Sequence, residues 1–243
     1  MKKKRKNKMQ KKIIKVIVYL ICLLTLFSIA PNYAKSDEYY VKDKMNLIID
    51  NENVTKNLKY NLFVNDRGVI YISIDDVKTY LDNSVIYDET NSQVITTYGE
   101  KKVKLPLNKN VIKINDVEQD VLSGAVEQGG IYYIPITVMK KIYEVDAEYI
   151  KNEKILVLDS RVKKLVKAYI SKNSSVKYKS THFSSTVDKI KKSDTVTVIE
   201  HLENNWTKIR TKNGKIGFIK TNILQNEICI REDINTKIID FSY

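Results

Sequence analysis

The stretch "GVIYISIDDVK" at residues 68–78 recurs as "GIYYIPITVMK" at residues 130–140. Each copy predicts a short strand that ends in Tyr-Ile-x-Ile and leads into a helix, because apolar residues follow at helical spacing. These are Ile74, Val77 and Leu81 in the first copy, and Val138, Ile142 and Val145 in the second. Two copies of such a unit are expected to complete one core together rather than to form two separate domains.

The flanking sequence repeats as well. Upstream, "LIIDNENV" (47–54) corresponds to "IKINDVEQDV" (112–121), and both read as hairpins. Downstream, "VIYDETNSQVITT" (85–97) corresponds to "AEYIKNEKILVL" (147–158), and both alternate like a pair of strands around a polar turn. The prediction is an α+β duplicated module over residues 46–159, with repeats at about 46–100 and 111–159.

This module resembles the copper amine oxidase N-terminal-like domain, which is common in exported proteins of Gram-positive bacteria. The resemblance is carried by the Ile-x-Ile-Asn-Asp hairpin at 112–116 and by Gly-x-Tyr-Tyr-Ile-Pro-Ile at 130–136. It implies a stalk rather than the copper-bearing catalytic domain. Copper sites favour imidazole, and the only two histidines, His182 and His201, lie outside this region. We therefore expect no metal, no cofactor and no amine oxidase activity.

The second half of the chain breaks into short strand-like pieces separated by polar stretches: "KAYI" (167–170), "SVKYK" (175–179), "TVTVIE" (195–200), "WTKIR" (206–210) and "KIGFIK" (215–220). This pattern predicts a small all-β barrel. Between the last two pieces, Asn213-Gly214 favours a tight hairpin, since the pair tolerates positive backbone angles.

The order of these features resembles a bacterial SH3 (SH3b) domain over residues 163–226. The segment "NWTKIRTKNGKIGFIKTNIL" (205–224) carries the resemblance most specifically, although Phe218 stands where the family more often has tryptophan. Residues 227–243 are left as a C-terminal tail. The resemblance implies binding of peptidoglycan or its cross-bridge peptides.

Five side chains are predicted to bind the ligand: Trp206, Arg210, Tyr178, Phe218 and Lys208. In a regular strand Trp206 and Ile209 point to opposite faces, so Trp206 lies outside the barrel if Ile209 fills it. An exposed indole offers an apolar face and an N–H donor, and Arg210 can hold a carboxylate in a bidentate pair. The alternative is that Trp206, Tyr178 and Phe218 belong to the small core.

The N-terminus predicts export. Residues 1–34 contain nine basic and no acidic residues, and an apolar run at 16–30 follows the basic segment. This order is typical of a signal peptide, or of a membrane anchor through residues 13–30 if the leader is not cleaved. The expected location is extracellular, in the cell wall or on the outer face of the cytoplasmic membrane.

Charge divides the rest of the chain. Residues 35–160 contain 16 basic and 21 acidic residues, whereas residues 161–243 contain 17 and 8. Outside a cell, such a basic module is expected to meet peptidoglycan or an anionic wall polymer, and export argues against nucleic acid as the partner. With Cys22 in the leader, Cys229 has no partner for an internal disulfide.

No catalytic constellation is recognised. Two Ser-x-x-Lys matches lack their companion motifs, and the sequence contains no Gly-x-Ser-x-Gly or His-Glu-x-x-His. The sequence therefore predicts a non-catalytic, cell-wall-associated protein with a stalk and a binding domain. The alternatives are a structural or interaction module that docks on another exported protein, and a truncated remnant of a wall hydrolase such as a family 18 glycosidase.

Overall fold

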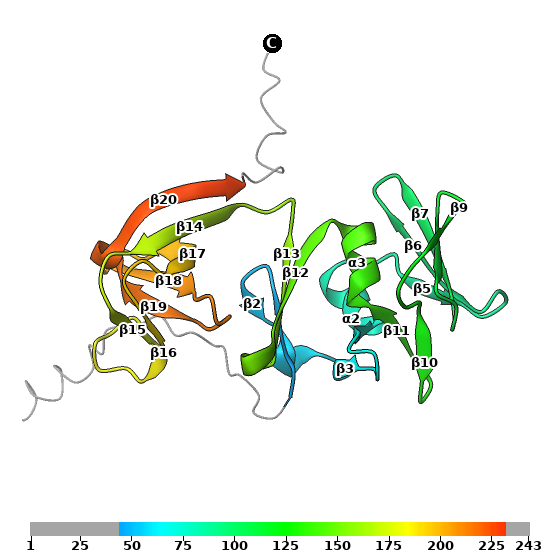
Figure 1. Cartoon of the computed structure of the whole chain (residues 1–243), viewed down its shortest axis with the longest axis horizontal. Helices are drawn as coiled ribbons and strands as arrows, with labels where there is room; N and C mark the ends of the chain where they lie inside the picture. Colours follow the sequence, from blue (N-terminus) through cyan, green and yellow to red (C-terminus); the bar gives the residue numbers. More distant parts are fainter. Residues whose placement is uncertain (1–43, 232–243) are drawn as a thin grey trace, which may run out of the picture. The chain divides into compact units, whose positions relative to one another are not determined.

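The chain divides into two units, residues 1–34 and residues 35–243. A computed structural model describes residues 44–231, all within the second unit (Figure 1). The predicted leader at 1–34 and residues 232–243 of the predicted tail lie outside the described residues.

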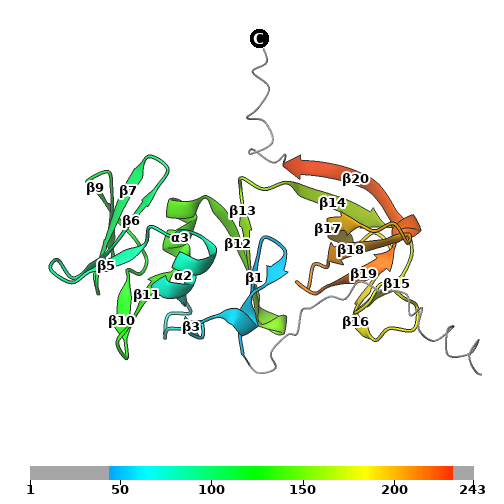
Figure 2. The same ribbon diagram turned by 180° about the vertical axis from the view of Figure 1, so that it is seen from behind.

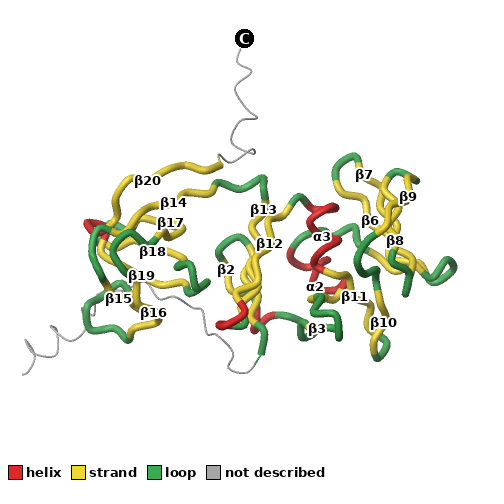
Figure 3. Tube along the Cα trace, viewed as in Figure 1, coloured by secondary structure: helices red, strands yellow, loops and turns green. Residues whose placement is uncertain are grey.

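The predicted α+β fold class is wrong, because the protein is mainly β. Strands make up 51% of the described residues, which contain two α-helices, α2 (Ile74–Tyr80) and α3 (Ile136–Tyr143). Figure 3 shows these two short helices among strands that dominate the rest of the trace. Both helices lie where the apolar spacing predicted them, but each is only about two turns long.

The strands of residues 46–160 form three sheets. The first has the order β12 (Val145–Ile150), β13 (Ile155–Ser160), β1 (Asn46–Ile49), β2 (Glu52–Asn53). The second has the order β10 (Val126–Gln128), β11 (Ile131–Pro135), β4 (Ile70–Ser73), β3 (Phe63–Val64). The third has the order β5 (Ile86–Asp88), β6 (Gln93–Tyr98), β7 (Lys101–Pro106), β8 (Val111–Ile114), β9 (Val117–Asp120).

The pairing between strands explains why no clear duplicated module forms. Strand β1 pairs in parallel with β13, near the far end of this region, and β4 pairs antiparallel with β11. Strands of the two predicted repeats thus pair directly in the first and second sheets, and β7, which lies between the repeats, joins them in the third. Their apolar residues share one core, in which Leu47, Ile72 and Leu105 pack with Ile134, Met139 and Leu156.

Residues 165–231 form a separate, entirely antiparallel sheet of seven strands. Its order is β16 (Thr186–Ile190), β15 (Ser174–Lys177), β19 (Ile216–Lys220), β18 (Trp206–Arg210), β17 (Thr195–His201), β14 (Leu165–Ile170), β20 (Leu224–Arg231). A second apolar core lies on one face and includes Ile170, Val176, Ile209 and Ile219. Within the described residues β16 and β20, the two ends of this order, do not pair with each other.

Two further details of this sheet concern its last strand and the turn between β18 and β19. Strand β20 continues to Arg231, so the first residues of the predicted tail belong to the sheet (Figure 2). The turn between β18 and β19 is longer than a two-residue hairpin: the Gly214 N–H donates to the Thr211 carbonyl at 2.9 Å, and Gly214 alone of the Asn-Gly pair has a positive φ, of 75°. A type I turn followed by a left-handed glycine accounts for this geometry.

Candidate functional site

Three of the five predicted binding residues lie on strand β18 and share one face of it. Ile209 is fully buried in the second core, and alternation places Trp206, Lys208 and Arg210 on the opposite face. Across the pair with β19, Trp206 lies opposite Lys220 and Lys208 lies opposite Phe218. With Ile209 in the second core, the face opposite that core is the candidate site.

Trp206 is nevertheless a covered residue, with 5% of its surface exposed. The ring of His182 meets it edge-on, with 5.2 Å between ring centroids. The ammonium group of Lys220 lies 4.5 Å from the centre of the indole, a distance at which a cation is attracted to the ring face. The indole is therefore packed between a lysine and the loop that carries His182.

The loop at residues 178–185, which carries His182, is held by its own hydrogen bonds. The Tyr178 N–H donates to the Ser185 carbonyl at 3.0 Å, and the Lys179 N–H donates to the Ser184 hydroxyl at 2.8 Å. Asn204, beside Trp206, donates to the Ser180 hydroxyl at 3.2 Å. These bonds hold the loop in place. Phe183, the residue after His182 in this loop, is 99% exposed.

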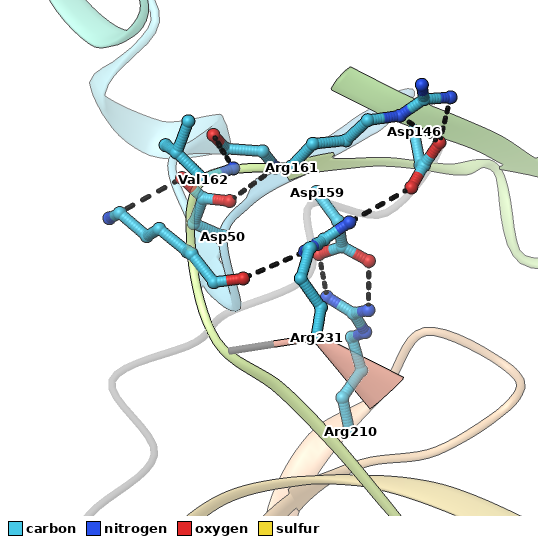
Figure 4. Close-up of polar contacts among 9 residues, drawn as sticks. Asp50, Asp146, Asp159, Arg161, Val162, Arg210 and Arg231 are labelled. Atoms are coloured by element: carbon cyan, nitrogen blue, oxygen red, sulfur yellow. Dashed lines mark hydrogen bonds and ion pairs between the residues drawn. The ribbon is translucent and has the colours of Figure 1, made fainter. Parts of the chain in front are cut away.

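Arg210 already holds a carboxylate. Its guanidinium donates two hydrogen bonds to Asp159, of 2.8 Å and 2.6 Å, and Arg210 itself is only 7% exposed (Figure 4). This is the bidentate pair that its chemistry predicts, but the partner belongs to β13 of the same chain. In this structure Arg210 therefore joins the two sheets rather than facing a ligand.

The other predicted binding residues are divided between core and surface. Phe218 is 1% exposed and fully packed. Lys208 and Tyr178 are half-buried and both make contacts within the chain. The structure thus brings Trp206, Lys208 and Phe218 together on one face, and it leaves the largest exposed aromatic surface to Phe183.

The Arg210–Asp159 pair belongs to a larger junction between residues 46–160 and the seven-stranded sheet. Ile216 of β19 packs with Ile48, Ile155 and Val157 in one buried cluster. Beside it lies a cleft of about 460 Å³ whose lining includes Asp159 and Arg210. The two halves of the described chain therefore share buried apolar and charged contacts.

Asp146 of β12 anchors the rim of this junction. It accepts hydrogen bonds from Arg161 at 2.9 Å and from Arg231 at 3.2 Å (Figure 4). Burial by itself would raise the pKa of Asp146, but the hydrogen bonds and charges of the two arginines outweigh it and lower the pKa below its usual value. Asp146 thus stays ionised and ties β20 to β12.

The acidic residues of the basic half are largely used internally. Of the five acidic residues in 161–231, Asp188 accepts from Thr211 at 2.6 Å and Asp194 accepts from Lys212 at 2.7 Å. Glu227 lies 3.1 Å from His201. The hydrogen bond from Lys212 lowers the pKa of Asp194, assisted by the Lys191 N–H. The 16 basic residues of the same range outnumber these acids, and Arg161, Arg210 and Arg231 among them pair with Asp146 and Asp159 of the first half.

Two residues of the candidate site, Phe183 and Asp159, were not predicted from the sequence, for different reasons. Phe183 is a lone aromatic in a Ser- and Thr-rich loop, and this was the available signal, because an apolar residue without apolar neighbours has no core to enter. Asp159 lies near the end of strand β13. No local sequence pattern distinguishes it from the other acidic residues as the partner of Arg210.

Within residues 44–231 no helix is long and apolar enough to cross a membrane. The same residues contain no group of three or more His, Cys, Asp or Glu side chains placed to hold a metal ion.

Comparison with known proteins supports the first half of the sequence interpretation. No curated protein matches the chain. Residues 48–158 match the family model of the copper amine oxidase N-terminal domain, which confirms the resemblance inferred for residues 46–159.

Proposed function

We propose that this is an exported, non-catalytic protein of the cell wall, in which residues 163–226 act as an SH3b-type module that binds peptidoglycan or an anionic wall polymer. Residues 46–159 serve as its stalk. The observation that carries the proposal is the charge of the second half: residues 161–231 contain 16 basic and 5 acidic residues, a net charge of +11, and most of the acids are already hydrogen-bonded inside the module.

The lysines gather where two turns meet. The Lys192 N–H donates to the Asn173 side chain at 2.8 Å, which brings Lys172 next to Lys191 and Lys192. All three are exposed. Closely spaced cations on one surface raise the local concentration of a polyanion and speed its association. We call Lys172, Lys191 and Lys192 the basic corner.

The loop at 178–185 supplies a contact of a different kind. The exposed ring of Phe183 offers an apolar face to a sugar ring or peptide. Trp206 lies directly beneath the neighbouring His182. In this proposal the basic corner attracts the polymer, and the aromatic loop holds the repeating unit.

Two matched pairs of variants test these roles. Replacing Lys172, Lys191 and Lys192 by alanine should weaken binding to isolated walls at low salt. Replacing three exposed lysines of the stalk by alanine, at Lys78, Lys102 and Lys109, removes the same charge and should not weaken this binding. Equal weakening by both triple variants would reduce the proposal to net charge alone.

For the loop, Phe183→Ala should weaken binding at high salt, where charge attraction is screened. Tyr149→Ala removes another exposed aromatic, 40% exposed in β12, and serves as its control. Unchanged binding of a folded Phe183→Ala protein would remove the loop from the site.

The absence of a recognised catalytic constellation and the matched domain type both support a binding role, since the N-terminal domain of copper amine oxidases is itself non-catalytic. Incubating the purified protein with wall preparations and measuring released fragments tests this directly. Release of soluble fragments would contradict the non-catalytic assignment.

A further inference from the structure

The cleft at the junction has two walls of opposite charge. One wall is a face of the first sheet, where Asp146 lies opposite Asp159 in the pairing of β12 with β13. Glu148 follows two residues after Asp146 and also lines the cleft. Because side chains two residues apart on a strand share a face, Asp146 and Glu148 point the same way. This wall therefore carries three carboxylates.

The other wall is a face of the seven-stranded sheet. Lys167 of β14 lies opposite Thr197 of β17, which lies in turn opposite Arg210 of β18. All three residues line the cleft, together with Thr195 and Lys212. This wall therefore presents cations and hydroxyl groups to the carboxylates of the first wall.

Most of the charges on the two walls are already paired within the chain, and Figure 4 shows the two paired aspartates of the first wall with their arginines. The pairs are Asp159 with Arg210, Asp146 with Arg161 and Arg231, and Lys212 with Asp194. Within residues 44–231, three charged residues of the lining form no ion pair: Glu148, Lys167 and Lys140 of α3. The cleft is thus left with one unpaired carboxylate and two unpaired ammonium groups.

Part of the lining is shielded from water. Val157, Val196, Thr197 and Thr211 are each 7% exposed or less. The volume of the cleft, about 460 Å³, lies within the range of about 300–1,000 Å³ that small-molecule sites usually occupy. A ligand seated against these residues loses part of its own water shell, and attraction between charges is stronger where water is excluded.

We propose that this cleft binds a short acidic peptide with a free N-terminus. Such a ligand carries one ammonium group and at least two carboxylates, which complement the unpaired Glu148, Lys167 and Lys140. Its ammonium group pairs with Glu148, and a carboxylate pairs with Lys167 and the hydroxyl of Thr197 on the opposite strand. Ammonium and hydroxyl groups both donate to carboxylate oxygens, and the charged contacts are the stronger ones.

This site is separate from the one proposed for wall material. Among the described residues that line the cleft, none belongs to the basic corner or to the loop at residues 178–185. Both halves of the chain contribute to the cleft, so the site exists only where the two halves meet. The inference therefore does not depend on wall binding.

A titration followed by NMR tests the site. The protein is residues 35–243, the compact unit that excludes the leader, in isotope-labelled form. The probe is the dipeptide glutamyl-alanine, which has one ammonium group and two carboxylates. We expect saturable shifts of the backbone amides of Glu148, Lys167 and Thr197 at millimolar probe. The N-acetylated dipeptide lacks the ammonium group and should bind roughly threefold to tenfold more weakly, as expected for the loss of one charged contact.

Matched variants locate the contacts. Glu148→Gln and Lys167→Gln each remove an unpaired charge without breaking an internal ion pair, and each should weaken binding of glutamyl-alanine by a similar factor. In the Glu148→Gln protein the free and the N-acetylated dipeptides should bind equally, because the partner of the ammonium group is gone. Glu203→Gln and Lys189→Gln remove exposed charges outside the cleft and should leave the affinity unchanged.

Three outcomes overturn the proposal. Equal binding of the free and the N-acetylated dipeptides to the unmodified protein would mean that the cleft attracts anions in general. The absence of saturable shifts at the cleft would mean that the peptide does not bind there. Binding that Glu203→Gln weakens as much as Glu148→Gln would show attraction by net charge instead of a defined contact. Wall binding is measured with wall preparations, so its success or failure is distinguishable from each of these outcomes.

Discussion

The guanidinium of Arg210 and the carboxylate of Asp159, 51 residues apart in sequence, form a bidentate pair between two sheets, at 2.8 Å and 2.6 Å. Both side chains are mostly buried, with 8% and 17% of their surface exposed. Together with the cluster of Ile48, Ile155 and Ile216, the pair couples the domain at 48–158 to the basic module. The stalk and the binding module of our proposal therefore share one junction.

Asp159→Asn should destabilise the protein by roughly 2–3 kcal/mol, because removing one partner of a buried ion pair leaves the other charge buried and uncompensated. The loss is smaller than the roughly 3–5 kcal/mol of a fully buried pair because Asp159 keeps some contact with water. Chemical denaturation measures the change. Replacing both residues by apolar ones, Asp159→Leu with Arg210→Met, should recover most of the loss. A single Asp159→Asn variant as stable as the unmodified protein would contradict this role.

Gly214→Ala should destabilise the junction for two reasons. Gly214 has a φ of +75°, which is unfavourable for alanine, and an added Cβ would come within 2.9 Å of the Ile150 side chain and 3.0 Å of Ile155. We expect a loss of about 2–3 kcal/mol, from backbone strain and overpacking together.

Gly99→Ala is the matched control, since Gly99 has a φ of +58° but nothing lies within 4 Å of its added Cβ. It should cost only the backbone strain of a left-handed alanine, about 1 kcal/mol. Thermal unfolding of the two variants side by side measures the difference. Equal losses would mean that Gly214 makes no tight contact with Ile150 and Ile155.

Acid should weaken the fold partly through Asp194. Its hydrogen bonds from Lys212 and the Lys191 N–H lower its pKa in the folded state below the ordinary 3.8. The unfolded chain therefore binds a proton first, and the stability from this carboxylate, present above pH 3.8, is lost as the pH falls through the lower folded pKa. The free energy of unfolding of Asp194→Asn should consequently fall less steeply below about pH 4 than that of the unmodified protein. Parallel pH profiles would show that Asp194 contributes nothing to acid sensitivity.

His182→Ala should uncover the indole of Trp206. Because Trp206 is the only tryptophan in the chain, its fluorescence reports this site alone. The variant should show red-shifted emission and stronger quenching by iodide, since the ring that meets Trp206 at 5.2 Å is removed. Ser171→Ala, a substitution outside this loop, serves as the control. An unchanged spectrum would mean that other groups cover Trp206.

Local features of the fold were predictable from the sequence, whereas the pairing of distant strands was not. Apolar spacing located both helices, and alternation placed Trp206 and Ile209 on opposite faces. These predictions depend on residues within one or two turns of each other. The parallel pairing of Asn46–Ile49 with Ile155–Ser160 depends on contacts more than 100 residues apart, and this exchange of strands makes the α+β duplicated description fail.

The candidate site shows the same limit. The chemistry of Arg210 predicted a bidentate carboxylate, but not that Asp159 supplies it. Trp206 and Phe218 were open to both interpretations, and burial of 95% or more places both within the packed structure. Phe183 was overlooked because a single aromatic residue in a polar loop has no periodic pattern.

Co-sedimentation of residues 35–243 with insoluble wall preparations tests the central claim most directly, using walls with and without their anionic polymers at low and high salt. We predict that the protein pellets with complete walls at low salt. Pelleting should persist at high salt, because salt screens the charge attraction but not the contact between the Phe183 loop and the repeating unit. A protein that stays in the supernatant with every preparation, including at low salt, would contradict the proposed wall-binding function.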